Sequence, residues 1–582
     1  VVIVVKDGEL FFAKGYGYQD AAKRVPVDPV KTLFREGSIS KLFTWTAVMQ
    51  LVEQGKLDLD TDVNTYLQGF KIPDTFSHPI TLRNLMTHTS GLEDGYLGYL
   101  YAQSDKDYVP LTEYLSKHLP ARVRSATVDF SDGTGVAYSN YGCALAGLIV
   151  ATVSGVDYEE FIDQHILQPL GMNSTSFHEP LPPLLAARLS QGYQFKEGAF
   201  EAQEFERAGN VAPAGSISAS GTDMAKFMIA HLRDGESDQS QILQPGTARL
   251  MHTRSLSPDP ALSGMDLGFW ELWVNGRRVL WHGGDTHNFH ASLSLVPEAH
   301  LGLFVAFNTG GDADSAAREF DRDFLQHYFP AQLPQVKPRA DAVARNRQYV
   351  GSYRDQRRSY TKIDKADQAG KDFQVDALPD GTLTFYDIVT GLQARWIEVG
   401  DGVFRDATAD AFVAFKRGSD GHSGYMVGPF PVLSFDRVPW YGTVSFQKWL
   451  LLISSALFLS ITISAFGRRR ADCEGPRGLR WARFTVAITG LFLLISSISV
   501  AMGLTSSDTS IETAVPGAFY LALPLILLAI PLTCVDLLFC VLAWRRGAWT
   551  LAARLHYSAA TLAAVGYLWL LNYWNLVGYR FG

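Results

Sequence analysis

Residues 35–43 read Arg35-Glu36-Gly37-Ser38-Ile39-Ser40-Lys41-Leu42-Phe43. A serine stands at the start of an apolar helix, and a lysine follows three residues later. Residues three and four apart share one face of a helix, so we expect Ser38 Oγ and Lys41 Nζ to meet just inside the helix N-terminus. A serine becomes a good nucleophile when a nearby base takes its proton, and a lysine serves as that base when its pKa is lowered. The stretch therefore predicts the reacting centre of a serine hydrolase.

Two later motifs support the interpretation of the Ser-x-x-Lys sequence at Ser38 as catalytic. It occurs three times, at Ser38, Ser359 and Ser445, and neither of the last two opens an obvious buried helix. Ser38 is followed in order by Tyr138-Ser139-Asn140 and by His282-Gly283-Gly284. The ordered set favours catalysis over the ordinary interpretations of the single residues, which are a helix cap, a surface lysine and a strand aromatic.

The second motif supplies groups that acyl transfer needs. We expect the phenol of Tyr138 to lie near the serine and the lysine and to relay the proton to the leaving group. We expect Asn140 to hold Lys41 and orient a substrate carbonyl; the alternative is that it caps the next helix. For His88 we expect that it holds a loop rather than takes part in the chemistry.

The third motif predicts the substrate-binding edge of a sheet. Gly283 and Gly284 would let a substrate backbone lie close to an edge strand, and His282 would line the site. The backbone amides of Ser38, at a helix N-terminus, and of Asp285, just after the glycines, are expected to form the oxyanion hole.

The three motifs resemble those of penicillin-recognising serine hydrolases, a family that includes class C β-lactamases, DD-peptidases, esterases and D-aminopeptidases. Supporting stretches that also match are Gly15-Tyr16-Gly17, Leu85-Met86-Thr87-His88-Thr89-Ser90-Gly91-Leu92 and Gln168-Pro169-Leu170-Gly171-Met172. The resemblance covers about residues 1–330. It implies an α+β fold, with an antiparallel sheet flanked by helices, a helical subdomain and the site between them.

His282 departs from the pattern of the best-known members, which usually have lysine there to help bind the substrate carboxylate. A histidine is mostly neutral at pH 7, so it anchors an anion less well. The resemblance places this substitution in the esterase and aminopeptidase branches. We also identify no deacylating glutamate like that of class A enzymes, which leaves Tyr138 as the expected activator of water.

Composition excludes several other classes of protein. The formal net charge of −8 over 582 residues does not indicate a basic surface that would bind nucleic acid. The four cysteines form no disulfide framework, and no Cys/His cluster has zinc spacing, so we expect neither a metal nor a cofactor.

The chain divides into several regions. The segment from Val1 to Phe12 predicts two strands joined by a Lys-Asp-Gly turn. This segment lacks the features of a signal peptide, so we expect a targeting segment upstream of it. Three prolines in 330–341 indicate a linker, which we place at 331–344, after the hydrolase domain at 1–330. Residues 345–440 predict a small all-β module. This module opens with Tyr349-Val350-Gly351-Ser352-Tyr353 and resembles the lipocalin-like module of some family members.

Residues 445–582 predict a membrane domain. Each of its apolar runs is near the ~20 residues that span a bilayer as a helix, and the four runs are about 449–466, 484–504, 517–544 and 555–574. The first and third connections are rich in arginine, whereas Thr505 to Pro516 has no Lys or Arg. The positive-inside rule then puts the hydrolase region and the C-terminus outside the cytoplasm. The alternative is four buried helices of a soluble domain. The multi-helix tail is similar to that of membrane-tethered family members.

We therefore expect an extracytoplasmic serine hydrolase, anchored by several helices in a bacterial inner or plasma membrane. It would cleave an amide or ester of a peptide, a D-amino-acid peptide or a small molecule through an acyl-enzyme. The alternatives are a β-lactam-hydrolysing protein, a penicillin-binding sensor that acylates slowly and signals through its helices, and a structural membrane protein with an inactive domain. The expected partners are the substrate and the lipid bilayer, with no nucleic acid; the sequence does not decide the oligomeric state.

Overall fold

A computed structural model describes residues 1–582 except 127–134, 312, 333–334, 387–392, 418–422, 468–478, 480, 507 and 582. The described residues form two compact units. The first comprises Val1–Asp94, Leu100–Arg357 and Phe373–Arg437, and the second comprises Gly95–Tyr99, Arg358–Asp372 and Val438–Gly582.

The first unit is built on a six-stranded antiparallel sheet with the order β10-β11-β12-β13-β1-β2. Its strands are β1 (Val2–Lys6), β2 (Glu9–Lys14), β10 (Trp270–Val274), β11 (Arg277–Asp285), β12 (His290–Val296) and β13 (Leu301–Phe307). The predicted hairpin at the start of the chain is confirmed as β1 and β2. Its turn, at Asp7 and Gly8, has positive φ at both residues, as tight hairpins require.

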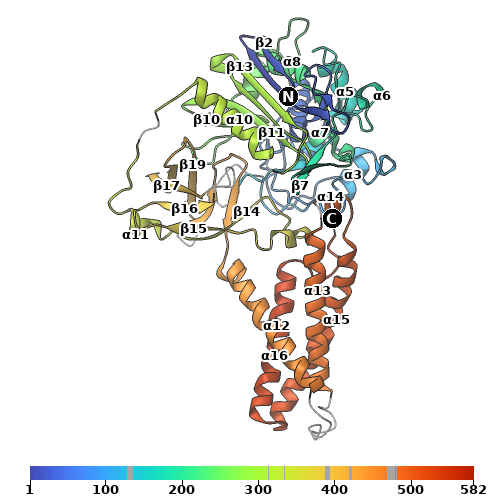
Figure 1. The fold of residues 1–582 in the computed structure, drawn as a ribbon, viewed down its shortest axis with the longest axis vertical. Helices are drawn as coiled ribbons and strands as arrows, with labels where there is room; N and C mark the ends of the chain where they lie inside the picture. The colour runs from blue at the N-terminus through green and yellow to red at the C-terminus, as the bar shows by residue number, and fades with distance from the viewer. Residues whose placement is uncertain are drawn as a thin grey trace. The chain divides into compact units, whose positions relative to one another are not determined.

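Helices cover both faces of this sheet. Directly paired residues of antiparallel strands share a face, and neighbours along a strand alternate. Ser294 pairs with Leu303 and donates its hydroxyl to Asp321 of α10 (Ala313–Tyr328), so α10 covers that face. Gly302, on the opposite face, lies against Met228 of α8 (Gly221–Leu232). Figure 1 shows α10 alongside these strands.

A helical region completes the hydrolase fold around α1 (Ser40–Glu53), which is buried on nearly every side and is preceded by a 3₁₀ turn at Gly37–Ile39. This agrees with the apolar pattern from Ser38 to Gln54. The helix packs against α4 (Asn140–Ser154) and α7 (Ala212–Gly215). The remaining helices of this region are α2 (Leu82–Met86), α3 (Leu111–Lys117), α5 (Tyr158–Ile162), α6 (Pro183–Ala186) and α9 (Pro245–Met251), and its short strands are β3 (Tyr18–Asp20), β4 (Val25–Pro26), β5 (Leu33–Arg35), β6 (Thr175–Ser176), β7 (Tyr193–Lys196), β8 (Ala199–Ala202) and β9 (Ser218–Ser220).

The predicted all-β module is a closed eight-stranded antiparallel barrel. It follows α11 (Ala342–Asn346), and its strands are β14 (Gly351–Asp355), β15 (Phe373–Ala377), β16 (Leu383–Tyr386), β17 (Gln393–Gly400), β18 (Val403–Asp406), β19 (Phe412–Arg417), β20 (Ser423–Val427) and β21 (Ser434–Arg437). Inward-facing aromatic side chains fill it, among them Tyr353, Trp396 and Phe415. A barrel closed in this way has no exposed strand edge.

The barrel packs against the hydrolase region within the same unit. Phe430 stacks on Trp281 with ring centroids 5.5 Å apart. Val432 belongs to one buried cluster with Val136 and Tyr138. The combined α+β fold and β module predicted from the sequence are thus confirmed.

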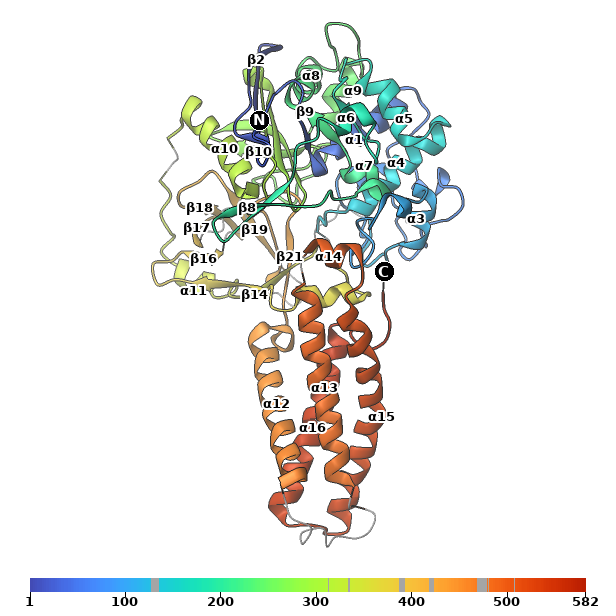
Figure 2. The same ribbon diagram turned by 45° about the vertical axis from the view of Figure 1, so that its right-hand side comes forward.

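The second unit is a bundle of four long helices, which run side by side in Figures 1 and 2. They are α12 (Val444–Gly467), α13 (Ala482–Leu504), α15 (Gly517–Arg545) and α16 (Leu551–Tyr573); the short α14 (Asp508–Thr513) lies between α13 and α15. By length and composition, α12, α13 and α15 are apolar enough to cross a membrane. The fourth run, α16, is equally long but carries Arg554 and His556 near its start.

Two further apolar helices are together long and apolar enough to cross a membrane, but only if they are counted as one bent span. These helices, Asn140–Ser154 and Tyr158–Leu167, belong to the hydrolase region and are bent by 78° at their junction. Three to four described helices are therefore long and apolar enough to span a membrane. The arginines of the first connection at 468, 469, 470, 477 and 480 lie outside the described residues.

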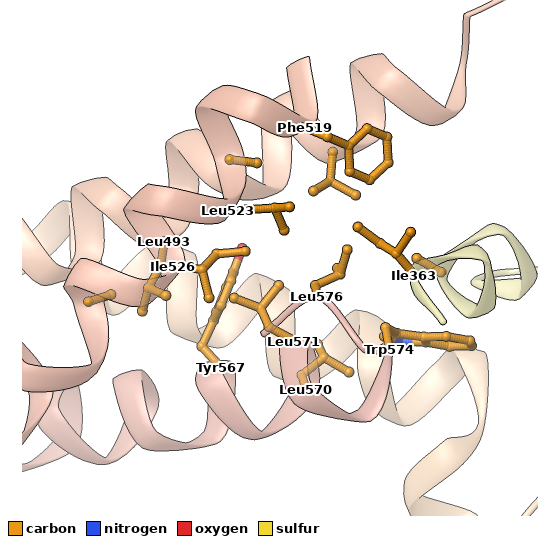
Figure 3. Packing of buried hydrophobic residues seen from close by; sticks show 14 of the residues in the cluster. Ile363, Leu493, Phe519, Leu523, Ile526, Tyr567, Leu570, Leu571, Trp574 and Leu576 are labelled. Atoms are coloured by element: carbon orange, nitrogen blue, oxygen red, sulfur yellow. The ribbon is translucent and has the colours of Figure 1, made fainter. Parts of the chain in front are cut away.

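Two distant segments of sequence pack onto one end of the bundle. Asp364 accepts hydrogen bonds from the backbone amides of Tyr96 and Leu97, at 2.8 and 2.7 Å. The amide of Gly98 donates to the carbonyl of Ile511 at 2.7 Å. Figure 3 shows Ile363 among the apolar side chains of this end, together with Phe519, Leu571 and Trp574. The sequence did not predict that residues 95–99 and 358–372 belong with the helices.

Asp536 is a buried carboxyl inside this bundle. Thr489 Oγ1 donates to Asp536 Oδ2 at 2.7 Å, and the hydroxyl of Tyr557 lies 3.4 Å from Oδ1. These contacts satisfy a polar group that would be costly in an apolar environment.

Candidate active site

The turn that carries Ser38 places the serine and the lysine in contact. Ser38 lies in the 3₁₀ turn and Lys41 in the first turn of α1, so the two side chains share a face. Lys41 Nζ donates to Ser38 Oγ at 2.9 Å and to the carbonyl of Ala214, in α7, at 2.7 Å. Lys41 is completely buried, whereas Ser38 is partly exposed.

Burial changes the protonation of Lys41. Loss of hydration lowers its pKa to about 7; of the smaller effects, that of Cys143 raises the pKa, the cation of Arg357 lowers it, and Asp94 raises it. Half of the Lys41 side chains are therefore neutral near pH 7 and able to accept a proton from Ser38. This is the state that a general base requires.

Tyr138 lies at the same site and keeps its proton. Its ring centroid is 4.8 Å from Lys41 Nζ, and the nearby hydroxyl of Ser38 acts to lower the pKa of the phenol. Burial raises the pKa of Tyr138 above its ordinary value. The phenol is therefore neutral at physiological pH, which suits a proton donor better than a base.

His88 supports the tyrosine, as expected for a residue that holds a loop. Its ring lies 4.4 Å from the ring of Tyr138, and its carbonyl accepts the amide of Ala137 at 2.9 Å. His88 Nδ1 accepts the amide N–H of Ser139 at 3.3 Å, so the proton of the neutral ring is on Nε2. Burial lowers the pKa of His88 well below its ordinary value, which keeps the ring uncharged.

Asn140 makes no hydrogen bond to Lys41 among the described residues. It is the first residue of α4 and is partly exposed, while both hydrogen bonds of Lys41 among the described residues go to Ser38 and Ala214. The helix cap is Ser139, whose hydroxyl accepts the amide of Gly142 at 2.9 Å. Among the described residues, Asn140 therefore neither hydrogen-bonds Lys41 nor caps α4.

His282 is buried and neutral. Its Nδ1 lies 2.6 Å from the carbonyl of Gly283, and a carbonyl only accepts, so the ring proton is on Nδ1. Burial and then the charge of Lys41 lower the pKa of His282 to about 3. Its unprotonated Nε2 is buried without a partner in the described structure, and its ring lies 6.5 Å from that of Tyr138.

Strand β11 lies against the serine turn through its glycines. A Cβ at Gly284 would lie 1.8 Å from the carbonyl oxygen of Glu36, and a Cβ at Gly37 would lie 2.9 Å from the amide nitrogen of Asp285. Gly37 also has φ +48, in the left-handed region. The amides of Ser38 and Asp285 therefore belong to two backbone segments in direct contact, as an oxyanion hole needs.

Gly284→Ala is expected to separate these two segments. The added methyl group would overlap the carbonyl of Glu36, which is backbone and cannot rotate away. A displacement near 1 Å costs about 100-fold in rate, so serine-directed phosphonate labelling should slow by about that factor or more. Gly246→Ala is the control, since nothing lies within 4 Å of its Cβ. Wild-type labelling of Gly284→Ala would contradict the packing described above.

The other two Ser-x-x-Lys sequences do not form a comparable pair. Ser359 Oγ accepts the backbone amide of Lys362 at 3.1 Å, and Lys362 Nζ donates to the carbonyl of Phe581 at 3.2 Å. Ser445 lies at the start of α12. Among the described residues, no group of three His, Cys, Asp or Glu side chains could hold a metal ion.

Sequence reasoning missed three residues of the site. Trp270 lies 5.3 Å from the ring of His282 and 6.0 Å from that of Tyr138. Arg357 lies 4.8 Å from the ring of Tyr138 and pairs with Asp94. Neither Arg357 nor Asp94 belongs to a recognisable motif, so only the fold could have identified them.

The contact of Ser38 with the buried Lys41, the neutral phenol of Tyr138 and the glycine strand fit the active site of a serine hydrolase. Residues 1–328 match the Beta-lactamase family model, and the chain belongs to that family of serine hydrolases.

Among curated relatives, the chain is 31% identical over 255 residues to the putative penicillin-binding protein PbpX of Bacillus subtilis, covering 42% of this chain and 59% of PbpX. It is 24% identical over 312 residues to the protein flp of Staphylococcus aureus strain MW2, covering 53% of this chain and 59% of flp. The chain thus spans about three fifths of the length of each of these relatives.

A solved structure extends the likeness in fold beyond the family match. The crystal structure of SurE has a TM-score of 0.52 at 21% identity, and the alignment covers 75% of this chain and 94% of SurE. A second SurE structure, with D-Leu, has a TM-score of 0.51 at 20% identity.

Proposed function

We propose that this protein is a membrane-anchored hydrolase that cleaves an amide or ester through an acyl-enzyme on Ser38. The observation that carries the proposal is the 2.9 Å hydrogen bond between Lys41 Nζ and Ser38 Oγ, formed by a lysine whose pKa burial lowers to about 7. An unactivated serine is a poor nucleophile, and a neutral amine within hydrogen-bonding distance supplies the missing base.

In the acylation step, Lys41 takes the hydroxyl proton as Ser38 Oγ attacks the substrate carbonyl carbon. The amides of Ser38 and Asp285 would stabilise the negative oxygen of the tetrahedral intermediate. Tyr138 then passes a proton to the leaving amine or alkoxide, and Lys41 restores the phenol proton. The carbon–nitrogen or carbon–oxygen bond breaks and the acyl group stays on Ser38.

Deacylation repeats the sequence with water as the nucleophile. Neutral Lys41 is a better acceptor of the water proton than Tyr138, because burial lowers the pKa of the lysine and raises that of the phenol. We therefore assign water activation to Lys41, in place of the tyrosine that we expected from the sequence.

The helices support a location at a membrane. Three to four of the described helices have the length and apolarity of membrane spans. The connection 505–516 has no Lys or Arg. Together with the arginine-rich connections, this favours a hydrolase held outside the cytoplasm of a bacterial cell.

The test is to treat the full-length protein with a fluorophosphonate and locate the adduct by mass spectrometry. We expect a single modified peptide that contains Ser38. An adduct elsewhere, or none, would contradict the proposal.

A substrate panel then separates the reaction classes. It consists of nitrocefin, p-nitrophenyl esters and D-amino-acid anilides. Turnover of an ester or anilide but not nitrocefin supports a peptidase or esterase, whereas turnover of nitrocefin supports a β-lactamase. A penicillin adduct on Ser38 that persists for hours without product supports a sensor.

A further inference from the structure

The β-barrel brings a cation into the hydrolase site. Arg357 follows strand β14 at a turn in which its amide donates to Asp355 Oδ1 at 2.8 Å. Its guanidinium lies 4.8 Å from the centre of the Tyr138 ring. Its Nε donates to Asp94 Oδ2 at 2.7 Å. An arginine more than 200 residues beyond Tyr138 in the sequence therefore touches the group proposed to relay the proton.

This contact belongs to a wider interface on the same side of the barrel. Val432 packs in one cluster with Tyr138, and the ring of Phe430 lies 5.7 Å from that of Trp270. Ser434 Oγ accepts the amide of Val136, two residues before Tyr138, at 3.1 Å. Apolar packing and a backbone hydrogen bond thus hold the barrel where Arg357 reaches the site.

Arg357 differs from the other basic groups of the site in exposure and charge. Its side chain is 41% exposed, whereas Lys41 and His282 are buried residues. Burial lowers the pKa of both His282 and His88, so neither ring is charged at neutral pH. Arginine stays charged at all physiological pH values.

The guanidinium also has unused donors. Nε is taken by Asp94, and the terminal nitrogens make no hydrogen bond to any residue in the described part of the chain. A guanidinium fork matches the two oxygens of a carboxylate and binds them with paired hydrogen bonds. The exposed face of Arg357 is thus ready for an anion that enters beside Tyr138.

We propose that Arg357 of the β-barrel is the specificity residue of the active site and binds a carboxylate of the substrate. The proposal rests on the proposed function and adds the chemical class of substrate: amides or esters that carry a carboxylate near the bond that is cleaved. In this chain the anion would be held by the barrel, because the histidine of β11 is uncharged.

The competing explanation is that Arg357 only fastens the barrel through its pair with Asp94. The two explanations differ in the effect of Asp94→Asn. If the ion pair is what matters, Asp94→Asn and Arg357→Met cause the same defect. If Arg357 binds substrate, Asp94→Asn leaves the guanidinium in place with less competition from a neighbouring carboxylate.

The experiment compares matched substrates that differ only in charge, with the full-length protein in detergent. In the first pair the carboxylate or the neutral amide is part of the leaving group; the two substrates are the hippuric acid thioesters of mercaptoacetic acid and of mercaptoacetamide. In the second pair it is part of the acyl group; the two substrates are the mono-p-nitrophenyl esters of adipic acid and of adipamic acid. The readout is the ratio of kcat/KM for the charged substrate to kcat/KM for the neutral one.

The ratio is measured on the high-pH plateau of each variant. Arg357 helps lower the pKa of Lys41, as burial does, whereas Cys143 and Asp94 raise it. Removing Arg357 therefore moves the pH at which Lys41 becomes neutral. Plateau values remove this difference from the comparison.

We expect the wild type to prefer the charged member of at least one pair, and Arg357→Met to reduce that ratio by about 10- to 100-fold, as loss of a charged hydrogen-bond pair does. The ratio for Arg357→Lys, which keeps the positive charge but not the paired donors of the guanidinium, should lie between the ratios of the wild type and Arg357→Met. Asp94→Asn should keep the ratio at the wild-type value or above. The neighbouring Arg358→Met is the matched control and should keep it unchanged.

The inference is overturned if the wild type shows no charge preference in either pair, if Arg357→Met keeps the wild-type ratio, or if Asp94→Asn loses as much as Arg357→Met. Fluorophosphonate labelling is measured on the same wild-type preparation. Absence of an adduct on Ser38 contradicts the proposed function, whereas a labelled enzyme without charge preference contradicts only the role of Arg357.

Discussion

Ser38→Ala is expected to lower turnover by roughly 10⁴-fold or more and to abolish phosphonate labelling, because no other group can form the acyl-enzyme. The hydroxyl is partly exposed, and its removal leaves the contact between Lys41 and the carbonyl of Ala214 in place. We therefore expect near-wild-type thermal stability. Turnover and labelling of the purified full-length variant, with its melting temperature, are the measurements.

The chain contains a matched control for this substitution. Ser359 also precedes a lysine by three residues, but its hydroxyl accepts a backbone amide and Lys362 donates to the carbonyl of Phe581. Ser359→Ala should keep wild-type labelling and turnover. Equal labelling of Ser38→Ala and the wild type would defeat the assignment of the nucleophile.

Lys41→Met is expected to lower the acylation rate by about 10²- to 10⁴-fold, the usual contribution of a general base. It should also remove the pH dependence of acylation near neutrality. In the wild type, the pKa of Lys41 is lowered to about 7, so the neutral, active form is lost as the pH falls through 7. The acylation rate should then fall about tenfold for each further pH unit.

His282 and Tyr138 do not titrate in this range. Burial keeps His282 neutral, with a pKa of about 3, and keeps the phenol of Tyr138 protonated by raising its pKa. Acylation rates of wild type and Lys41→Met between pH 5 and 9 are the measurement, and Lys362→Met is the control. A wild-type slope below pH 7 that persists in Lys41→Met would assign the base to another group.

The motifs predicted the centre of the site because local geometry decides it. A spacing of three residues in a helix is enough to bring Ser38 and Lys41 together. The two glycines of β11 indicate that another backbone segment lies close to this strand, whatever its place in the sheet. The hairpin at the N-terminus, the buried helix α1 and the barrel strands follow in the same way from turn residues and from the apolar pattern.

Contacts between distant residues were harder to predict. The hydrogen bond from Lys41 to Ala214 and the packing of His88 on Tyr138 depend on how loops meet in space. The expected hydrogen bond between Asn140 and Lys41 is not found among the described residues, where Lys41 donates to Ser38 and Ala214. Residues 95–99 and 358–372, which join the helical unit, also carry no signal in the sequence.

The sequence by itself determined the nucleophile turn, the order of the three motifs, the all-β module and the apolar helices, because helix and strand periodicity and covalent spacing act over short distances. Only the tertiary structure decided that Lys41 is buried enough to act as a base, that His282 is neutral, and that the barrel adds Arg357 beside Tyr138. A pKa depends on the dielectric surroundings and charges that the whole fold assembles, and a contact across 219 residues depends on packing that no local pattern records.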